Sequence, residues 1–230
     1  MWALSASALA GPGELVMLAP LDQAMPIARI QNGAISGGIV KDFGDVLAQR
    51  LGRRPVYLNA DTPDVRPALG SGRADAMCYV MPFWIDGDYN WSPPLFPDAE
   101  MIAARKDMPH LRSLKDLRDQ PIGTVAGYKY QRVELVLGKR FRRVDAVNME
   151  ANIQQMASGK VPYTMISEAT LNYLHRTTPA MKVRPDLVFS AYKAQCAFSQ
   201  KSKIPFDEVS RAIDTLLKDG SIDQILARYR

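Results

Sequence analysis

The chain has 230 residues, of which 47% are hydrophobic and 23% are charged, a composition typical of a globular protein with a buried core. No segment approaches the roughly 20 consecutive apolar residues that a membrane-spanning helix requires. The formal net charge is +5, but the basic residues are scattered and no nucleic-acid-binding module surrounds them, so no nucleic-acid partner is expected. The densest basic run, Lys139 to Arg143, is interpreted as a solvated turn between a helix and a strand.

The first ten residues resemble the end of a signal peptide. They are apolar and rich in small residues, and Ala8-Leu9-Ala10 has the small-x-small form of a signal-peptidase site. The basic n-region and most of the apolar stretch of a signal peptide are missing. We expect a residual signal peptide over residues 1–10 and a mature chain that begins near Gly11. A frayed N-terminal arm is the alternative.

Strand and helix patterns alternate from Glu14 onward. In the segment Gly38 to Leu51, apolar residues recur at three- and four-residue spacing, which predicts an amphipathic helix that Gly52 ends. The other elements predicted in this half are strands at Glu14–Leu18, Pro55–Leu58 and Ala74–Tyr79 and a helix at Pro63–Leu69. Such alternation favours α/β architecture with mainly parallel strands and crossover helices.

A second α/β set follows Ser92-Pro93-Pro94, which is typical of a connector. Its predicted strands are Met101–Ala104, Pro121–Val125 and Val161–Ile166, and its predicted helices are Ser113–Leu117, Tyr130–Leu137, Ala151–Ala157 and Glu168–His175. Two further helices, Ile204–Lys218 and Ser221–Tyr229, are separated by Asp219-Gly220, and Ser221 is a plausible N-cap. Two sets in one chain indicate two lobes.

Two cysteines, Cys78 and Cys196, lie in apolar segments with a strand-like pattern. An exported protein can join such a pair in a disulfide, provided that the Cα atoms approach within about 7 Å. Free buried thiols are also common in segments of this kind and are the alternative, so the sequence leaves the state of the two cysteines open.

Several short segments resemble, in order and spacing, the family 3 extracellular solute-binding proteins, which serve ABC importers of polar amino acids. The matching segments are Gly37-Gly38 through Asp42, Ser71 to Asp75 (SGRAD), Trp91 to Phe96 (WSPPLF), Ser113 to Leu117, Ile122 to Tyr128 (IGTVAGY), Gly159 to Val161 (GKV) and Lys218 to Tyr229 (KDGSIDQILARY). Each segment alone is a weak signal, but together they span nearly the whole chain.

The resemblance implies a type II periplasmic-binding-protein-like fold: two α/β lobes with mixed, mainly parallel sheets, joined by two crossing strands, and a ligand in the cleft. It places the first lobe at residues 11–97 and 194–230 and the second at residues 98–193. It also implies a periplasmic monomer without a cofactor, whose partners are a small-molecule ligand and a membrane ABC permease.

The sequence differs from the family at the positions that bind the amino acid in other members. Members usually place an Arg after the SGRAD-like strand and an Asp in the second lobe. Here no basic residue lies between Asp75 and Trp91, and the acidic position falls at Ser167, with Glu168 beside it. We therefore do not expect a standard amino acid bound in the usual way.

A different clamp is predicted from the residues that remain. The turn Gly127–Tyr130 precedes a helix, where free N–H groups and Lys129 favour an anion, although Lys129 is alternatively a surface lysine. Arg66 opens a helix near the expected cleft and suits a carboxylate, although a solvent-facing position is the alternative.

Aromatic and acidic side chains complete the candidate site. Tyr79 and Trp84 follow a strand at its C-terminal end, where ligands of open α/β sheets tend to bind, and Tyr128 and Tyr130 flank Lys129. Each aromatic ring is alternatively part of the core. Asp22 lies in the first strand-to-helix loop, near another contact region of the family.

Two further functions were weighed against a carrier. Cyclohexadienyl dehydratases resemble these binding proteins, and Glu168 as general acid, with Lys129 and Arg66 gripping carboxylates, is a workable arrangement. A ligand-sensing module is the other, but such domains are usually attached to spanning helices, so a free-standing carrier is expected. No hydrolase or zinc motif is present in the sequence.

Overall fold

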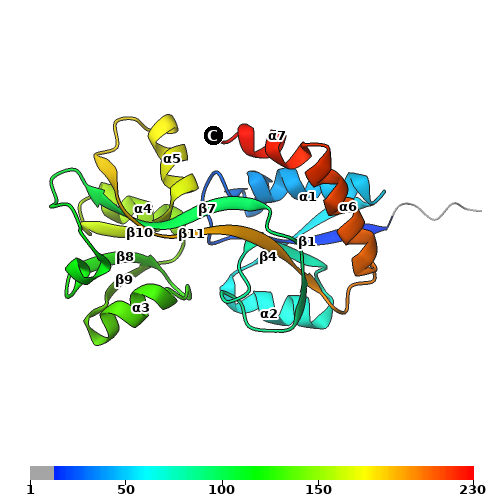
Figure 1. Cartoon of the computed structure of the whole chain (residues 1–230), viewed down its shortest axis with the longest axis horizontal. Coiled ribbons are helices and arrows are strands. Elements are labelled where there is room, and N and C mark those ends of the chain that lie inside the picture. Colours follow the sequence, from blue (N-terminus) through cyan, green and yellow to red (C-terminus); the bar gives the residue numbers. More distant parts are fainter. Residues whose placement is uncertain (1–12) are drawn as a thin grey trace, which may run out of the picture.

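The computed structural model describes residues 13–230 and consists of two lobes joined by two long strands (Figure 1). Strands β7 (Phe96–Arg105) and β11 (Val183–Ser199) run antiparallel to each other and pass from one lobe into the other. The predicted two-lobed α/β class is therefore confirmed, and the predicted lobe boundaries fall inside these two strands. The predicted signal-peptide remnant and Gly11 lie outside the described residues.

Lobe I combines the N-terminal part of the chain with its C-terminal part. Its elements are β1 (Glu14–Pro20), β2 (Arg29–Gln31), β3 (Ala34–Gly37), α1 (Ile39–Arg50), β4 (Arg54–Ala60), α2 (Thr62–Ser71), β5 (Ala76–Val80), β6 (Tyr89–Trp91), α6 (Phe206–Lys218) and α7 (Ser221–Ala227). The sheet order is β4-β1-β5-β11, and β6 also pairs with β11. Strand β1 is parallel to both β4 and β5, as alternating strands and helices predict.

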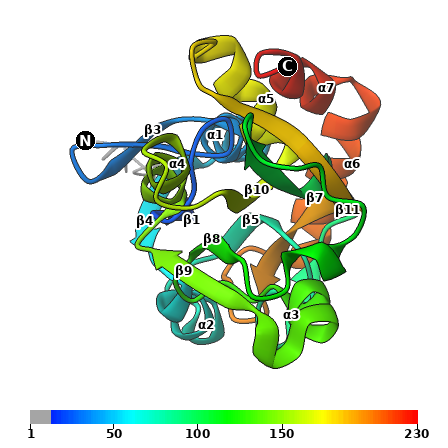
Figure 2. The same ribbon diagram turned by 90° about the vertical axis from the view of Figure 1, so that its left-hand side faces the viewer.

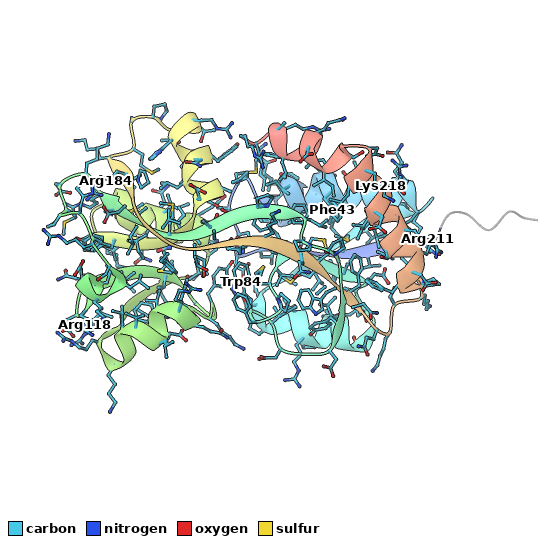
Figure 3. The ribbon with its side chains drawn as sticks, in the orientation of Figure 1. Phe43, Trp84, Arg118, Arg184, Arg211 and Lys218 are labelled. Atoms are coloured by element: carbon cyan, nitrogen blue, oxygen red, sulfur yellow. A yellow bond between two sulfur atoms is a disulfide. The ribbon has the colours of Figure 1, made fainter. Side chains whose placement is uncertain are left out.

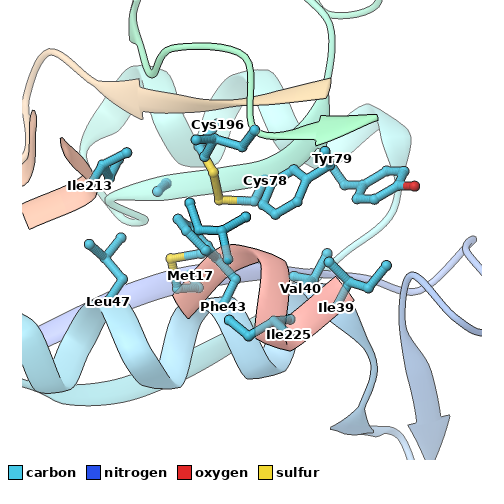
Figure 4. Packing of buried hydrophobic residues seen from close by; sticks show 14 of the residues in the cluster. Met17, Ile39, Val40, Phe43, Leu47, Cys78, Tyr79, Cys196, Ile213 and Ile225 are labelled. Carbon is cyan, nitrogen blue, oxygen red and sulfur yellow. A yellow bond between two sulfur atoms is a disulfide. The ribbon is translucent and has the colours of Figure 1, made fainter. Parts of the chain in front are cut away.

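The main core of lobe I packs α1, α6 and α7 against one face of this sheet (Figure 4). The predicted apolar face of α1 is buried at Ile39, Phe43 and Leu47. A disulfide joins Cys78 on β5 to Cys196 on β11, within this core. The sequence left this bond open, because the cysteines lie 118 residues apart and only the antiparallel pairing of the two strands brings them together.

Lobe II is continuous in sequence. Its elements are the 3-10 turn Leu114–Leu117, β8 (Pro121–Val125), α3 (Gln131–Leu137), the 3-10 turn Gly138–Arg140, β9 (Arg142–Ala146), α4 (Met149–Ala157), β10 (Tyr163–Ser167) and α5 (Glu168–Thr177). The strand order in lobe II is β11-β7-β10-β8-β9. Figure 2 views the molecule from the lobe II end and shows α3 below this sheet and α4 and α5 above it. Arg142 and Arg143, predicted in a turn, belong to the edge strand β9.

Two local predictions need correction. Gly220, with φ of +76°, is the N-cap of α7, whereas the backbone N–H and hydroxyl of Ser221 donate to Asp219 Oδ1 over 3.0 and 2.5 Å. The β2–β3 hairpin was not predicted, because its two short strands carry little alternation. Among residues 13–230, no helix has both the length and the apolar character needed to cross a bilayer.

Candidate functional site

A cavity lies between the lobes, close to the crossing strands, and both lobes contribute to its wall. Most of the wall is apolar, with three methionines from three different strands and helices (Met77, Met149 and Met165). Polar groups are fewer and come mainly from loops and element ends: Asp22, Gln23, Thr62, Glu100, Lys129, Ser167 and Thr170. A mostly apolar pocket with a few converging polar groups is the usual form of a small-molecule site.

Asp22 brings a buried carboxyl group to the lobe I wall. It follows β1, and its Oδ2 accepts a 2.7 Å hydrogen bond from the hydroxyl of Thr62, the first residue of α2. Burial raises the pKa of Asp22 above its usual value, and the hydrogen bond from Thr62 opposes this only in part. The backbone carbonyl of Asp22 accepts from Met149 N–H of lobe II over 2.9 Å, which joins the lobes across the cleft.

Tyr79 reaches the cavity through an irregularity in β5. The pairing of β5 with β11 shifts register here, and Tyr79 has a φ of +65°, which a bulky side chain rarely adopts. Its hydroxyl donates to Asp98 Oδ2 over 2.8 Å, at the margin of the core drawn in Figure 4. The bulge thus turns the ring toward the junction of the lobes.

Asp98, on β7, gathers donors from both lobes and from the crossing strands. Besides Tyr79, it accepts hydrogen bonds from the hydroxyl of Tyr192 over 3.2 Å and from the backbone N–H of Ala169 over 2.9 Å. Ala169 lies in the first turn of α5, so Asp98 occupies a free donor at that helix N-terminus. Asp98 thus binds the hydroxyl groups of two tyrosines, both of which line the cavity.

Trp84 completes an aromatic corner with Tyr192, at an edge-to-face centroid separation of 5.0 Å. Figure 3 shows Trp84 where lobe I meets lobe II, whereas the labelled Arg118 and Arg211 lie toward the outer ends of the molecule. Aromatic rings in this arrangement present π faces that attract apolar groups and cations.

The turn Gly127–Tyr130 forms the lobe II wall opposite Thr62. Gly127 has a φ of +80°, and a side chain there would meet Thr62 across the cleft at 3.5 Å. The hydroxyl of Tyr128 accepts from Gln23 Nε2 of lobe I over 2.5 Å. Arg143 holds the turn from behind, since it donates to the Tyr128 carbonyl over 3.1 Å.

Lys129 extends from the same turn to the other lobe. Its Nζ donates to Asp86 Oδ2 over 2.8 Å, and this contact lowers the pKa of Asp86 below its usual value. Nearby, Gln131 Nε2 donates to the carbonyl of Phe83 over 3.0 Å. The loop before β6 and the start of α3 are therefore joined when the lobes are closed.

Glu100 lies on β7, directly opposite Ser167 of β10 and Ser190 of β11. It is half-buried, and burial raises the pKa of its carboxyl group. Arg132 counteracts this shift and Ser190 donates a hydrogen bond, but burial is the larger effect.

Most of the predicted site residues meet in this cavity. Eight of them line it: Asp22, Tyr79, Trp84, Gly127, Tyr128, Lys129, Tyr130 and Ser167. Arg66 and Glu168 do not line it, and both are exposed. On α2 the inward residue is Val65, and the next position is turned by about 100°. Glu168 is likewise turned outward as the first residue of α5 after Ser167.

Two backbone donors of the predicted anion turn are engaged within the chain. Tyr128 N–H donates to the carbonyl of Val125 over 3.2 Å, and Tyr130 N–H donates to Glu134 Oε1 over 3.2 Å. Glu100 and Tyr192 were not predicted, because they lie on the crossing strands and only the fold brings them to the cleft. No local motif marks either residue.

No protein-family model and no curated protein matches the chain. Among solved structures, an ancestral arginine-binding protein bound to arginine is 21% identical, with a TM-score of 0.81 over 96% of this chain and 99% of that chain. The arginine-, lysine-, histidine-binding protein ArtJ from Geobacillus stearothermophilus is 19% identical, with a TM-score of 0.78 over 94% of each chain.

A histidine kinase sensor domain with similarity to periplasmic binding proteins is 19% identical, with a TM-score of 0.77 over 95% of this chain and 96% of that chain. Sequence identities of this size support a shared fold only, and the fold of this chain matches that of each of these proteins along almost their full length. The chain therefore has the two-lobed fold that periplasmic binding proteins share with such sensor domains.

Proposed function

We propose that this chain is a solute-binding protein of the family 3 type, which closes its two lobes on a small polar solute and delivers it to a membrane ABC permease. The observation that carries the proposal is the cavity, whose wall is assembled from both lobes and the strands that cross between them. Hinge closure of two lobes around a ligand is a common form of conformational change in binding proteins.

Contacts across the cleft support this reading. Asp22 O accepts from Met149 N–H, Gln23 donates to Tyr128, and Lys129 pairs with Asp86. Each contact joins a residue of one lobe to a residue of the other. In the proposed function these contacts therefore form together when the lobes close around the cavity. A solute that fills the cavity would bind the closed form better than the open form and shift the population toward closure.

Export to the periplasm is part of the same proposal. The Cys78–Cys196 disulfide suits an oxidising compartment, because disulfides persist there and are rare in the cytosol. We propose that the protein acts there as a monomer and presents surfaces of both lobes to its permease. No cofactor is required for this role.

Thermal shift and small-angle X-ray scattering test the function together. The protein is unfolded and refolded to remove any bound solute, then screened against amino acids, amines, dicarboxylates, aromatic acids and prephenate. A binding protein should show a rise in Tm, by mass action, and a smaller radius of gyration with at least one of them. Silence across the panel would contradict the proposal.

The same screen separates a carrier from an enzyme. In a dehydratase-like reading Glu168, Lys129 and Arg66 would act together on a bound ring acid, but Glu168 and Arg66 lie outside the cavity wall. We therefore expect prephenate to remain unchanged during incubation with the protein. Formation of an aromatic product, followed by absorbance, would replace the carrier with a lyase.

A further inference from the structure

The charged groups of the cavity wall are mainly acidic. Asp22 lies on the lobe I side and is buried, whereas Glu100 lies on β7 beside β10 of lobe II and is half-buried. The hydrogen bonds to them from Thr62 and Ser190 come from neutral hydroxyl groups, and Arg132 offsets the burial of Glu100 only in part. A carboxylate whose desolvation is incompletely compensated is costly, and a cation brought into the cavity would relieve that cost.

Positive charge for an anionic solute is scarce at the same wall. Within residues 13–230, no arginine lines the cavity, and Lys129 is the one lysine that does. Its ammonium group is 2.8 Å from the Asp86 carboxylate and is therefore already paired. A carboxylate in the cavity would face Asp22 and Glu100 without a free cation to balance it.

Aromatic rings supply the second, independent feature. Trp84, Tyr79 and Tyr192 meet at the junction of the lobes, and the hydroxyls of both tyrosines are held by Asp98. All three residues line the cavity; Tyr79 is stacked on Phe96 at a centroid separation of 5.4 Å, and Trp84 and Tyr192 are the more exposed of the three. Organic cations bind strongly to a group of aromatic ring faces, and the attraction increases when the cation is shielded from water.

We propose that the solute is a small organic cation without a carboxylate, such as a primary amine or a methylated ammonium, held between Asp22, Glu100 and the rings of Trp84, Tyr79 and Tyr192. This inference rests on the proposed binding function and names its class of ligand. It replaces the carboxylate expected from Lys129 and Arg66, because Lys129 is paired and Arg66 lies outside the cavity.

Calorimetric titration with matched pairs of solutes tests the charge of the ligand. Agmatine is compared with arginine, and cadaverine with lysine, because the members of each pair differ in the carboxylate; tetramethylammonium and succinate are also titrated. We expect the decarboxylated member of at least one pair to bind about tenfold more tightly than its amino acid. Tighter binding of the amino acids, or binding of succinate alone, would overturn the proposal.

Variants test the residues that hold the cation. Glu100→Gln and Trp84→Ala should each weaken binding of the best cation about tenfold or more, since each removes a contact to the charge. Glu168→Gln is the matched control, because this exposed carboxylate lies one residue beyond the cavity wall. Equal affinity of Glu100→Gln and Glu168→Gln would contradict a carboxylate contact at Glu100. Circular dichroism melts of each variant confirm that it is folded.

The failure of this proposal is distinct from the failure of the binding function. If a dicarboxylate or an amino acid closes the lobes, the proposed binding function stands and the proposal of a cationic ligand is overturned. A panel in which no compound changes Tm or the radius of gyration overturns both.

Discussion

Asp22, which lines the cavity, is expected to lower the stability of the folded protein. Its carboxyl group is 9% exposed, and the side-chain hydroxyl of Thr62 is its neutral partner within lobe I. Burial raises its pKa, so folding favours the protonated form, and ionisation at neutral pH weakens the folded state. The penalty is absent below the unfolded pKa near 3.8 and develops as pH rises through the folded pKa.

Asp22→Asn should therefore stabilise the ligand-free protein at pH 7. The amide oxygen can still accept from Thr62, while the buried charge is gone, and we expect a Tm about 2–4 °C higher for each 1 kcal/mol recovered. The difference should shrink as pH falls toward 4, because the wild-type carboxyl group then becomes protonated. Calorimetry between pH 4 and pH 7 measures it. A less stable variant at pH 7 would show that the folded protein already compensates this charge.

At the residue scale, the sequence predicts the site where a loop or turn carries the side chain. The turn around Gly127 and the loop with Asp22 follow strands, and this position leads directly to the cavity. Arg66 could not be placed, because its direction depends on the rotation of α2 against lobe I. Glu100 could not be found, because its neighbours across the sheet, Ser167 and Ser190, are remote in sequence.

Elements of opposite lobes are joined by the ion pair between Lys129 and Asp86. Lys129 precedes α3, Asp86 precedes β6, and their side chains are 42% and 70% exposed. Exposed pairs contribute little individually, but this one joins the two lobes, so we expect it to act on the closing equilibrium.

A charge-swap series distinguishes a closing contact from a solute contact. Lys129→Ala and Asp86→Ala should each weaken ligand affinity by up to about fivefold. The double variant Lys129→Asp with Asp86→Lys should recover most of the loss, with affinity measured by calorimetry. If Lys129 instead contacts an anionic solute, Asp86→Ala would strengthen binding by freeing the ammonium group, and the swap would not recover it.

The disulfide fastens two neighbouring strands of lobe I, β5 and β11. Replacing both Cys78 and Cys196 with Ala should lower the free energy of unfolding by about 2–5 kcal/mol, because the unfolded chain loses a long cross-link. Urea titration measures the change. Reduced wild-type protein is the control, and its free energy of unfolding should match that of the double variant. If the oxidised wild-type protein and the double variant unfold at the same urea concentration, the result would argue against the disulfide.

At the element scale, helices were predicted more fully than strands. Apolar spacing located α1 and α6, because a helix buries a stripe of its own side chains. The long strand β11 was not predicted as one element, because its first part alternates irregularly between exposed and half-buried residues. Its conformation depends on pairing with β7, a strand that occurs much earlier in the chain.

At the scale of the whole molecule, side chains join the lobes at more than one place. At the cavity wall, Lys129 pairs with Asp86. On another side, Arg176 of α5 donates to the backbone carbonyls of Tyr229 and Arg230, which follow α7; Figure 2 shows α5 and α7 side by side. Closure can therefore be adjusted by contacts between side chains of the two lobes, and the charge-swap series is designed to detect this effect.

Lobe I is made of two distant parts of the chain, and lobe II of one continuous part. During synthesis or passage through a translocation channel, every strand of lobe II has emerged before the last third of lobe I exists. The strand that carries Cys196, with α6 and α7 behind it, must then join a half-built partner. The protein thus has a built-in order of assembly, in which the lobe with the disulfide is completed last and the cleft exists only once the whole chain is present.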